Sequence, residues 1–466
     1  MKKNRTEKDT IAAISTPIGV GGLAIIRISG LKAIKVASKI FRAKNKKSIS
    51  KAKSHTIKYG HIFSYPKNIK PIDEVLLSLM RGPKTYTTED VVEISCHGGL
   101  VSARVILELL LRSGARLAEP GEFTKRALIN GRIDLLQAEA VNDMVNAKTD
   151  KSLQLAFEHL KGNFSSSIKQ MADGLADIIS DIEAAIDFDS QHIKSLNKKK
   201  IKGNLKRKLD TLEKMLREAD YGIVVNEGIS VVICGKANVG KSSLMNAFLK
   251  TEKVIVSPIA GTTRDTIEEI INIKGVALKF IDTAGIIKSA GILEAKSIEK
   301  TIESLKKADL ALLILDVSKK ITSDDKKIMD LISDKPHIIA LNKVDLKNNI
   351  NFKSMSDFLN NKKVIHISAI RRTNLDKLEE EILKCVFDGH TRNINSQMIN
   401  NLRQKELIKN SYNALSRGYK SLNDNLSYEF VSLDLREALN HLLTITGQAV
   451  SADILERIFS KFCIGK

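Results

Sequence analysis

Long apolar runs are missing from the sequence. The longest ones, such as residues 310–315 and 338–341, fall far short of the roughly 20 apolar residues that a membrane-spanning helix needs. The N-terminal segment, with Lys2 and Lys3, weakly resembles a signal peptide, but acidic residues and Pro17 interrupt the apolar segment that should follow. We therefore expect a mature protein without a membrane span.

Cysteine is scarce, and its spacing shows no pairing. The four cysteines are Cys96, Cys234, Cys385 and Cys463, with no C-x-x-C pair among them. A disulfide framework or a cysteine zinc site needs closer or repeated spacing, so neither is predicted. Unpaired cysteines fit a reducing compartment, and we therefore expect a cytoplasmic protein.

Acidic residues are fewer than basic ones. The chain has 75 Lys and Arg against 54 Asp and Glu, a formal net charge of +21. Such an excess attracts polyanions, among them nucleic acids. Lysine is nevertheless spread along the whole chain, with clusters at residues 44–53, 198–208 and 362–363. The charge therefore leaves two interpretations open, nucleic-acid binding or compositional bias.

The first quarter of the chain alternates strand-like and helix-like segments. Strands are expected at residues 23–28, 73–80 and 90–95, and an apolar-striped helix at residues 100–111. With 466 residues, the chain is long enough for about three domains. Residues 1–122 are therefore predicted to form a compact α/β domain.

Long helices follow from about residue 123. Apolar residues recur every three or four positions from Leu153 to Ile186, which predicts one continuous amphipathic helix about 50 Å long. A second stripe runs from Ile201 to Leu216. The lysines at 198–200 are expected to form the loop between the two helices.

These apolar stripes need partners, which appear only in the helical residues 397–464. We therefore predict a helical domain made of two pieces, residues 123–222 and 381–466. A separate domain, residues 223–380, is inserted between them. The expected fold class is a multidomain α/β and all-α protein.

The inserted domain begins with a phosphate-binding motif. Residues 235–242 read Gly-Lys-Ala-Asn-Val-Gly-Lys-Ser, after a strand-like run at 229–234 and before a helix-like run at 243–248. In this context the backbone N–H groups wrap the β-phosphate, Lys241 contacts the β- and γ-oxygens, and the Ser242 hydroxyl can ligate Mg²⁺. A nucleotide site is therefore predicted.

Two further motifs belong on the phosphate side of that site. Residues 261–265 read Gly-Thr-Thr-Arg-Asp, where Thr263 can add a second Mg²⁺ ligand from a switch segment. Residues 282–285 read Asp-Thr-Ala-Gly and follow an expected strand, which places Asp282 near the metal and Gly285 near the γ-phosphate.

The identity of the nucleotide base is predicted from residues 342–345, Asn-Lys-Val-Asp, which follow a strand at 338–341. The Asp345 carboxylate can accept both the N1–H and the 2-amino donors of guanine, whereas adenine offers an acceptor at N1 and no 2-amino group. Residues 368–370, Ser-Ala-Ile, can supply backbone donors to the base oxygen. The nucleotide is therefore expected to be GTP.

These motifs carry a family resemblance. Asn-Val-Gly-Lys-Ser-Ser-Leu at 238–244, together with the motifs at 261–265 and 282–285, resembles the bacterial translation-factor-class GTPases of the Era, Der and MnmE (TrmE) group. The flanking segments that resemble the MnmE family of tRNA modification GTPases are GEFTKRA at 121–127, DLLQAEA at 134–140, AAIDF at 184–188 and FCIGK at 462–466. The likeness spans essentially the full length, and it implies an inserted Ras-like GTPase domain.

The resemblance implies hydrolysis assisted by K⁺. Ile286 follows Gly285, so the water-positioning glutamine of Ras-like enzymes is missing. In this family K⁺ binds beside the phosphates when two GTPase domains dimerise, and it supplies the charge of an arginine finger. The positions that match the K⁺ ligands are Asn238, Ser257, Ile259 and Thr262.

Glu294 matches the family's glutamate that orients or activates water, which makes it the expected catalytic residue. By itself it could equally be a surface charge on a helix, as Glu299 and Glu303 nearby could be. The residues predicted to contact GTP are Asn238, Val239, Gly240, Lys241, Ser242, Ser243, Ser257, Ile259, Gly261, Thr262, Thr263, Asp282, Thr283, Ala284, Gly285, Asn342, Lys343, Asp345, Ser368 and Ala369.

The resemblance also implies a folate site in the N-terminal domain, which would double as a dimerisation domain. The ligand would be 5-formyl- or 5,10-methylene-tetrahydrofolate, and the matching positions are Arg27, Glu93, Arg132 and Lys466. Glu93 could accept hydrogen bonds from the pterin, and the three cations could meet the folate carboxylates. Each of the four could instead be a solvated charge or an ion-pair partner.

Two residues depart from the family pattern at this site. Arg132 stands where a lysine is common, and Thr88 replaces a glycine often seen in the segment at residues 86–90. Cys463 lies in the terminal motif, where its thiol could be reactive or buried.

The implied function is that of a homodimeric GTP hydrolase that acts on tRNA. It would form a heterotetramer with a flavoprotein of the MnmG (GidA) type and add a (carboxymethyl)aminomethyl group to C5 of the wobble uridine. The alternative is an Era-like switch for ribosome assembly, which would need an RNA-binding module such as a KH fold, and residues 381–466 contain no G-x-x-G loop. A membrane-remodelling GTPase would need an interfacial segment, and none is evident.

Overall fold

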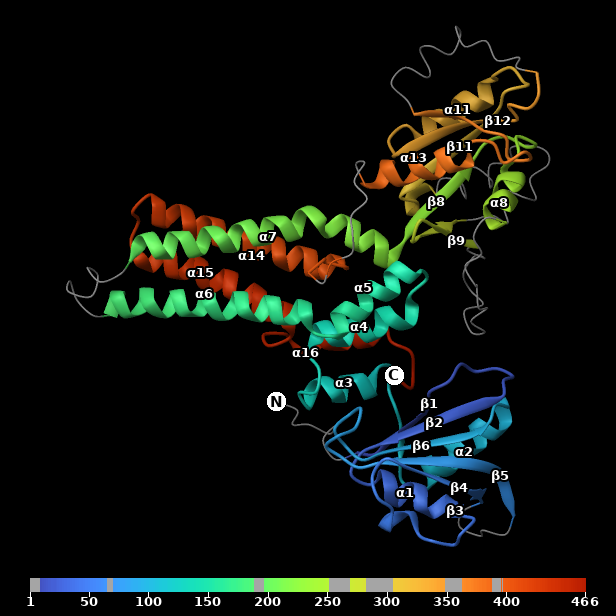
Figure 1. Ribbon diagram of the computed structural model, residues 1–466, viewed down its shortest axis with the longest axis vertical. Helices are drawn as coiled ribbons and strands as arrows, with labels where there is room; N and C mark the ends of the chain where they lie inside the picture. Colours follow the sequence, from blue (N-terminus) through green and yellow to red (C-terminus); the bar gives the residue numbers. More distant parts are fainter. Residues whose placement is uncertain are drawn as a thin grey trace.

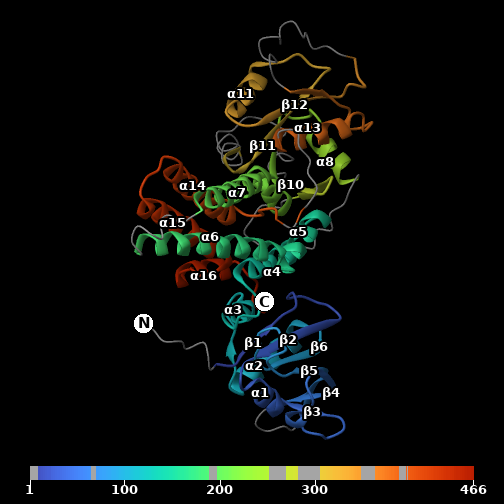
Figure 2. The ribbon, with the colours of Figure 1, turned by 60° about the vertical axis from the view of Figure 1, so that its left-hand side comes forward.

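Three bodies lie one after another along the molecule in the computed structural model, which describes residues 9–64, 70–187, 197–250, 269–281, 305–347, 363–387, 395 and 397–466. An N-terminal α/β body lies at one end, a helical body in the middle, and a second α/β body at the other end (Figures 1 and 2). The predicted combination of α/β and all-α architecture is therefore confirmed.

The N-terminal body is built on a seven-stranded sheet in the order β3-β4-β5-β6-β2-β1-β7. Its elements are β1 (Ile11–Ile14), β2 (Leu23–Ser29), α1 (Ala33–Ile40), β3 (Phe41–Ala43), the 3₁₀ turn η1 (Ile49–Lys51), β4 (Thr56–Phe63), β5 (Pro71–Met80), β6 (Val91–His97), α2 (Leu100–Arg112) and β7 (Arg116–Leu117). The predicted strands and helix are present, with ends shifted by at most two residues. Helices α1 and α2 pack on one face, where Ile26, Leu77 and Ile94 are buried.

The helical body contains α3 (Glu122–Ile129), α4 (Leu135–Asn146), α5 (Asp150–Leu160), α6 (Asn163–Asp187), α7 (Lys198–Glu227), α14 (Leu402–Asn423), α15 (Tyr428–Thr446) and α16 (Ala452–Phe459). Leu175 of α6 and Leu212 of α7 share one buried cluster with Leu415 of α14 and Leu435 of α15. The predicted discontinuous helical domain is therefore confirmed. Within the described residues, no helix combines the length and apolarity that crossing a membrane requires.

The single continuous helix predicted from Leu153 onward is wrong, because the chain turns between α5 and α6. Gly162 has a φ of 85°, in the left-handed region that ends helices at glycine. Leu153 and Phe157 are exposed on α5 instead of continuing the stripe. The three-to-four spacing of apolar residues runs through the turn without a break, and Gly162 was the only sign of the turn in the sequence.

The loop predicted at the lysines 198–200 is also wrong, since α7 begins at Lys198. The side chain of Asn197 accepts a hydrogen bond from the backbone N–H of Lys200 and caps the helix. This cap satisfies a donor of the first turn despite the run of positive charge, which opposes the helix dipole there.

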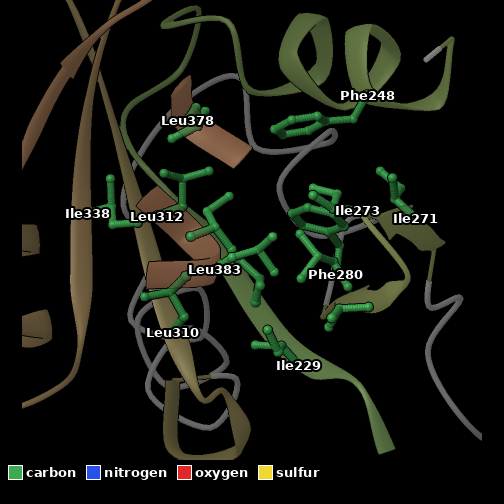
Figure 3. Close-up of a cluster of buried hydrophobic side chains, with 14 of the residues drawn as sticks. Ile229, Phe248, Ile271, Ile273, Phe280, Leu310, Leu312, Ile338, Leu378 and Leu383 are labelled. Carbon is green, nitrogen blue, oxygen red and sulfur yellow. The ribbon is translucent and has the colours of Figure 1, made fainter. Parts of the chain in front are cut away.

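Within the described residues, the nucleotide-binding body has a six-stranded sheet in the order β13-β12-β11-β8-β10-β9, in which β9 and β10 pair antiparallel and the other neighbours pair parallel. Its elements are β8 (Ile229–Cys234), α8 (Lys241–Leu249), β9 (Glu269–Ile273), β10 (Val276–Phe280), β11 (Leu310–Asp316), α11 (Ser323–Ile332), β12 (His337–Asn342), β13 (Val364–His366) and α13 (Leu375–Phe387). Phe248 of α8 packs on Phe280 of the sheet, with ring centroids 6.1 Å apart, and Leu378 of α13 lies beside Leu312 (Figure 3). The parallel strands end at one edge of this sheet, which brings their following loops together.

Candidate functional site

The phosphate-binding loop links β8 to α8 through backbone conformations that favour glycine. Gly235 has a φ of 142° and Gly240 a φ of 101°. A Cβ on Gly240 would lie 2.2 Å from Nδ2 of Asn342, so the loop closes only with glycine there. Ser242 and Ser243 follow in the first turn of α8, where free backbone N–H groups attract an anion.

Lys241 points back over this loop. Its Nζ donates to the carbonyl oxygens of Gly235 and Lys236, both at 2.6 Å. Burial lowers the pKa of Lys241, because the half-buried ammonium has lost part of its hydration. An anion bound in the loop would restabilise the charged form, which is the behaviour expected of a phosphate-binding lysine.

Asn342, at the end of β12, ties the phosphate loop to the base-side motif. Its Nδ2 donates to the carbonyl oxygen of Val239 at 2.8 Å, and its Oδ1 accepts from the backbone N–H of Ala369 at 2.9 Å. The side chain is only 2% exposed, so both bonds are protected from water. The structure thus brings together three of the predicted motifs.

The base side of the site is organised by Asp345. Its Oδ1 accepts a hydrogen bond from the Ser368 hydroxyl at 2.5 Å, and that hydroxyl accepts from the N–H of Arg371 at 3.1 Å. The Ser368 bond lowers the pKa of Asp345, which keeps this carboxylate ionised and able to accept. An ionised carboxylate can accept hydrogen bonds from the two donors on one edge of guanine.

Asp316, the last residue of β11, was missed by the sequence analysis. Lys343 Nζ contacts Oδ2 of Asp316 at 2.6 Å and the carbonyl oxygen of Asn238 at 2.7 Å. Burial by itself would raise the pKa of Asp316, but hydrogen bonds from Lys343 and Ser318 outweigh it and the pKa is lowered. Asp316 therefore positions Lys343 over the loop. The sequence feature that could have identified this residue is an aspartate at the end of an apolar strand.

Part of the predicted site falls outside the described residues. These positions are Ser257, Ile259, Gly261, Thr262, Thr263, Asp282, Thr283, Ala284, Gly285 and Glu294. In the described ranges, no group of three or more His, Cys, Asp and Glu side chains could hold a metal ion. The geometry above therefore concerns the phosphate loop and the base side.

Two family models match the chain. The MnmE helical domain matches residues 135–463, and the GTP-binding protein TrmE N-terminus matches residues 10–132. The chain belongs to the MnmE family of tRNA modification GTPases. The family and the enzyme class predicted from the motifs are confirmed.

Relatives named tRNA modification GTPase MnmE are similar over nearly the whole chain. The one from Alkaliphilus oremlandii is 43% identical over 465 residues, with 98% of this chain and 99% of the relative covered. The one from Clostridioides difficile is 43% identical over 462 residues with the same coverage, and that from Ligilactobacillus salivarius is 41% identical with 99% of each covered. Full-length likeness of this kind does not favour the Era-like alternative.

Solved structures resemble only part of the chain. Era from Aquifex aeolicus bound to GDP·AlF₄⁻ is 28% identical, with a TM-score of 0.27, and covers 40% of this chain and 66% of its own. The G domain of FeoB from T. maritima is 25% identical, with a TM-score of 0.26, and covers 34% of this chain and 98% of its own. At these scores the likeness adds nothing to the assignment.

Two of the four predicted folate positions, Arg27 and Arg132, lie over one aromatic ring, that of Tyr86. Arg27 and Glu93 face each other across β2 and β6, with Arg27 Nε 2.8 Å from Glu93 Oε1. The Arg27 guanidinium lies 5.5 Å from the ring centroid of Tyr86, and that of Arg132 lies 4.8 Å from the same ring. Arg132 also donates to the carbonyl oxygen of Tyr86 at 2.9 Å.

The C-terminal tail completes this cluster. Arg27 Nη1 donates to the carbonyl oxygen of Gly465 at 3.3 Å, and the N–H of Phe123 donates to an oxygen of Lys466 at 3.1 Å. Beside Tyr86 and Arg132 opens a pocket of about 530 Å³, also lined by His55 and Lys84. An aromatic ring, a carboxylate and several cations together fit a planar heterocycle with an anionic tail.

The departures from the family pattern have structural counterparts. Thr88 adopts a φ of 64°, a left-handed conformation that a β-branched residue rarely takes and a glycine takes freely. Its loop is held by Glu89, which accepts from Ser29 at 2.7 Å and from the buried Arg126 at 3.0 Å. The sequence analysis missed this network, because ion pairs between distant segments leave no local pattern. Cys463 is free and exposed, so the buried alternative is wrong.

Proposed function

We propose that this chain is a K⁺-activated GTP hydrolase that, with a flavoprotein of the MnmG type, adds a (carboxymethyl)aminomethyl group to C5 of the wobble uridine of tRNA. The observation that carries the proposal is the Arg27, Glu93, Tyr86 and Arg132 cluster, closed by the chain's own C-terminal tail. A GTPase that only switches needs no second site of this kind. The GTP cycle would change the arrangement of the domains, and the flavin would belong to the partner.

At the GTPase site, each residue has a role that its chemistry supports. Lys241 and the N–H groups of the loop would hold the phosphates, and Asp345 would select guanine. Mg²⁺ would be held by the hydroxyls of Ser242 and Thr263 and would neutralise the phosphate oxygens. Glu294 would orient the attacking water.

K⁺ would bind next to the phosphates. Asn238 is exposed in the phosphate loop, which leaves its side chain open to a ligand, with Ser257, Ile259 and Thr262 completing the set. The ion would place a positive charge where charge develops in the transition state. Two GTPase domains would have to meet to form this arrangement.

Homodimerisation through the N-terminal domain is supported by the sheet face that α1 and α2 leave open. Leu23 is 68% and Leu76 46% exposed on that face, and Val20 in the preceding loop is fully exposed. Exposed apolar side chains on one sheet face favour an interface, and a second copy would cover them with two-fold symmetry. Arg27 and Glu93 lie on the same face, so the dimer would form beside the folate site.

Tetrahydrofolate would supply the one-carbon unit. Glu93 would accept from the pterin donors, Arg132 and Lys466 would meet the carboxylates of the tail, and Tyr86 would stack on the ring. Arg27 would hold the Glu93 carboxylate in place through their ion pair. The exposed thiol of Cys463 lies in the tail that these contacts bring to the site.

We further propose domain limits at residues 1–122, 123–222, 223–380 and 381–466. The buried clusters around β6 and α6 support cores for the N-terminal and helical parts, whereas the cluster around β8 also includes Leu155, Tyr221 and Ile382 from outside residues 223–380. A cytoplasmic location is supported by the four free cysteines, which a reducing compartment preserves.

The test is nucleoside analysis of tRNA from a strain that lacks this gene. We expect wobble uridines without the C5 substituent, and their restoration by the wild-type gene. Complementation by Glu93→Ala is expected to fail while the purified variant still hydrolyses GTP. Wobble uridines that stay modified in the deletion strain would overturn the proposal and leave the GTPase assignment in place.

A further inference from the structure

The chain crosses between the helical and nucleotide-binding domains twice, and both crossings meet at one place. The outgoing crossing is the end of α7, which leads directly into β8, and the returning one is residues 397–401 ahead of α14. Figure 1 shows α7 reaching β8 close to α4 and α5. A change in the angle of the nucleotide-binding domain must therefore act on this place.

A carboxylate of α4 holds both crossings. Asn400 Nδ2 donates to Asp143 Oδ2 at 2.7 Å, and Asn226 near the end of α7 donates from its Nδ2 to the carbonyl oxygen of Asn400 at 3.2 Å. Asn226 also lies close enough to Asp143 to act on its pKa, which it lowers. Asn400 is fully buried, so its bonds are not exchanged with water. The outgoing and returning chains thus share one anchor.

Close packing reinforces this anchor. A Cβ on Gly222 of α7 would lie 2.0 Å from the carbonyl oxygen of Ile399, so the returning chain fits against α7 only because that residue is glycine. The buried His159 of α5 donates from Nε2 to the carbonyl oxygen of Met398 at 2.9 Å. The returning chain is therefore held from α4, α5 and α7 at once.

Two further contacts extend the anchor in both directions. Thr149, which caps α5, donates from Oγ1 to the carbonyl oxygen of Gly275 at 2.9 Å, in the turn between β9 and β10. Toward α14, Arg403 forms two bonds with Glu139 of α4, at 2.7 and 2.9 Å. The cluster therefore spans from the GTPase sheet to the helical core.

Asp143 is bound by uncharged side-chain amides, whereas a buried carboxylate is usually paired with a cation. The charged groups that act on it are Glu139 on its own helix and Glu227 on α7, while His159 on α5 and Arg403 on α14 interact with Glu139. Burial raises the pKa of Asp143 to about 7 against the hydrogen bonds from Asn226 and Asn400, and Glu139 and Glu227 raise it further. Asp143 can therefore gain or lose its proton near neutral pH, which changes its hydrogen bonding to the two amides.

We propose that Asp143, Asn226 and Asn400 form the joint that transmits the nucleotide state of the GTPase domain to the helical domain. Asp143 is a positioning residue in this joint, which couples GTP hydrolysis to tRNA modification. The inference rests on the proposed function. A turn of the nucleotide-binding domain moves the two crossings relative to α4, and it must break or remake these hydrogen bonds.

The test compares Asp143→Ala and Asn400→Ala with wild type in the full-length protein. Amide hydrogen exchange is measured in α4 and in residues 397–401, with GDP and with GDP·AlF₄⁻, beside the GTP turnover number. Wild type is expected to change its exchange in α4 at least tenfold between the two nucleotides. The variants are expected to lose most of this difference and to keep turnover within about twofold, since neither residue touches the nucleotide.

The matched control is Glu183→Ala. Glu183 of α6 accepts from Ser432 at 3.0 Å and from Arg436 of α15, so the change also removes an interhelical carboxylate, but away from the joint. This variant is expected to keep the nucleotide-dependent exchange. A Glu183→Ala response as weak as that of Asp143→Ala would show a general loss of packing and overturn the proposal.

Asp143→Asn keeps the shape of the side chain and guards against misfolding of the alanine variant. It is expected to keep the difference in amide exchange between the two nucleotides. In wild type this difference should vary between pH 6 and 8, and in Asp143→Asn it should not. A wild-type response in Asp143→Ala, or an Asp143→Asn response that follows pH as wild type does, would overturn the joint. A wild type that hydrolyses no GTP would instead contradict the proposed function.

Discussion

At the scale of single residues, one carboxylate decides which base the site accepts. Asp345 presents acceptors only, and its hydrogen bond from Ser368 holds it ionised and oriented. Guanine offers two donors on the edge that a carboxylate can meet, whereas xanthine offers one donor and one acceptor. The match depends on the chemistry of one side chain and not on the shape of the domain.

Asp345→Asn is therefore expected to exchange the preferred nucleotide. A carboxamide carries one acceptor and one donor, which pairs with xanthine and leaves a donor of guanine opposed by another donor. Loss of a charged hydrogen bond of about 1.5–3 kcal/mol predicts a ten- to hundredfold weaker affinity for GTP and a gain for XTP. Titration calorimetry with both nucleotides checks this. Unchanged GTP affinity would contradict the placement of the base.

Thr88 carries strain at the same scale. Its φ of 64° places a β-branched residue in a left-handed conformation, at a cost that glycine does not have. Thr88→Gly is expected to raise the free energy of unfolding by up to about 1 kcal/mol, since the glycine's larger unfolded-state entropy offsets part of the relieved strain. Urea unfolding measures the change. Thr88→Ala, which keeps a Cβ in that conformation, is the control and should gain less.

At the scale of elements, the seam between α4, α5 and α7 contains two titratable groups with opposite shifts. Burial lowers the pKa of His159 to about 4, and burial raises the pKa of Asp143 to about 7. Stability from the neutral His159 is lost as the pH falls from about 6.5 to 4, because the unfolded chain then binds the proton. Stability from the protonated Asp143 is lost as the pH rises from about 4 to 7. The two contributions oppose each other over most of this range.

Asp143→Asn isolates one of them. The asparagine does not titrate, so the variant should gain stability relative to wild type as the pH rises from about 4 to 7, and the gain should stay constant above pH 7. Conversion of the shift, reduced for the partial exposure of Asp143, predicts a gain of about 2 kcal/mol. Denaturant unfolding of both proteins at pH 5 and pH 8 measures it. A difference independent of pH would show that Asp143 is ionised throughout.

At the scale of the whole molecule, an open sheet face and three bodies in a row suggest an assembly larger than one chain. Figure 2 shows the N-terminal sheet at the opposite end from the nucleotide-binding domain. A dimer through that sheet would set the distance between two GTPase domains, which the proposed K⁺ arrangement requires to meet. The joint at Asp143 lies between these two ends.

Leu76→Asp is expected to break this dimer. The side chain is 46% exposed on the open face of β5, so a charge there costs the monomer little but cannot be buried against a second copy. Light scattering after gel filtration should give the mass of one chain for the variant and of two for wild type. Lys58→Asp, a change on the same sheet, is the comparison. GTP affinity should be unaffected, and a variant that stays dimeric would place the interface elsewhere.

The sequence by itself determined the local features. The glycines of the phosphate loop, the carboxylate of Asp345 and the apolar runs of β8 and β12 each follow from conformation or chemistry within a few residues, so their placement was predictable. The folate positions came from family resemblance. The break at Gly162 and the cap at Asn197 were equally local, but the continuing apolar period and the lysine run outweighed them.

Only the tertiary structure decided which distant residues meet. Asn342 reaches Val239 across 103 residues, Arg27 reaches Gly465 across 438, and Asp143 reaches Asn400 across 257. No periodicity encodes such contacts, because they depend on how whole faces pack and on where the inserted domain leaves and re-enters the helices. The bridge of Asn342, the ring of charges around Tyr86 and the joint at Asp143 therefore appear only once the chain is folded.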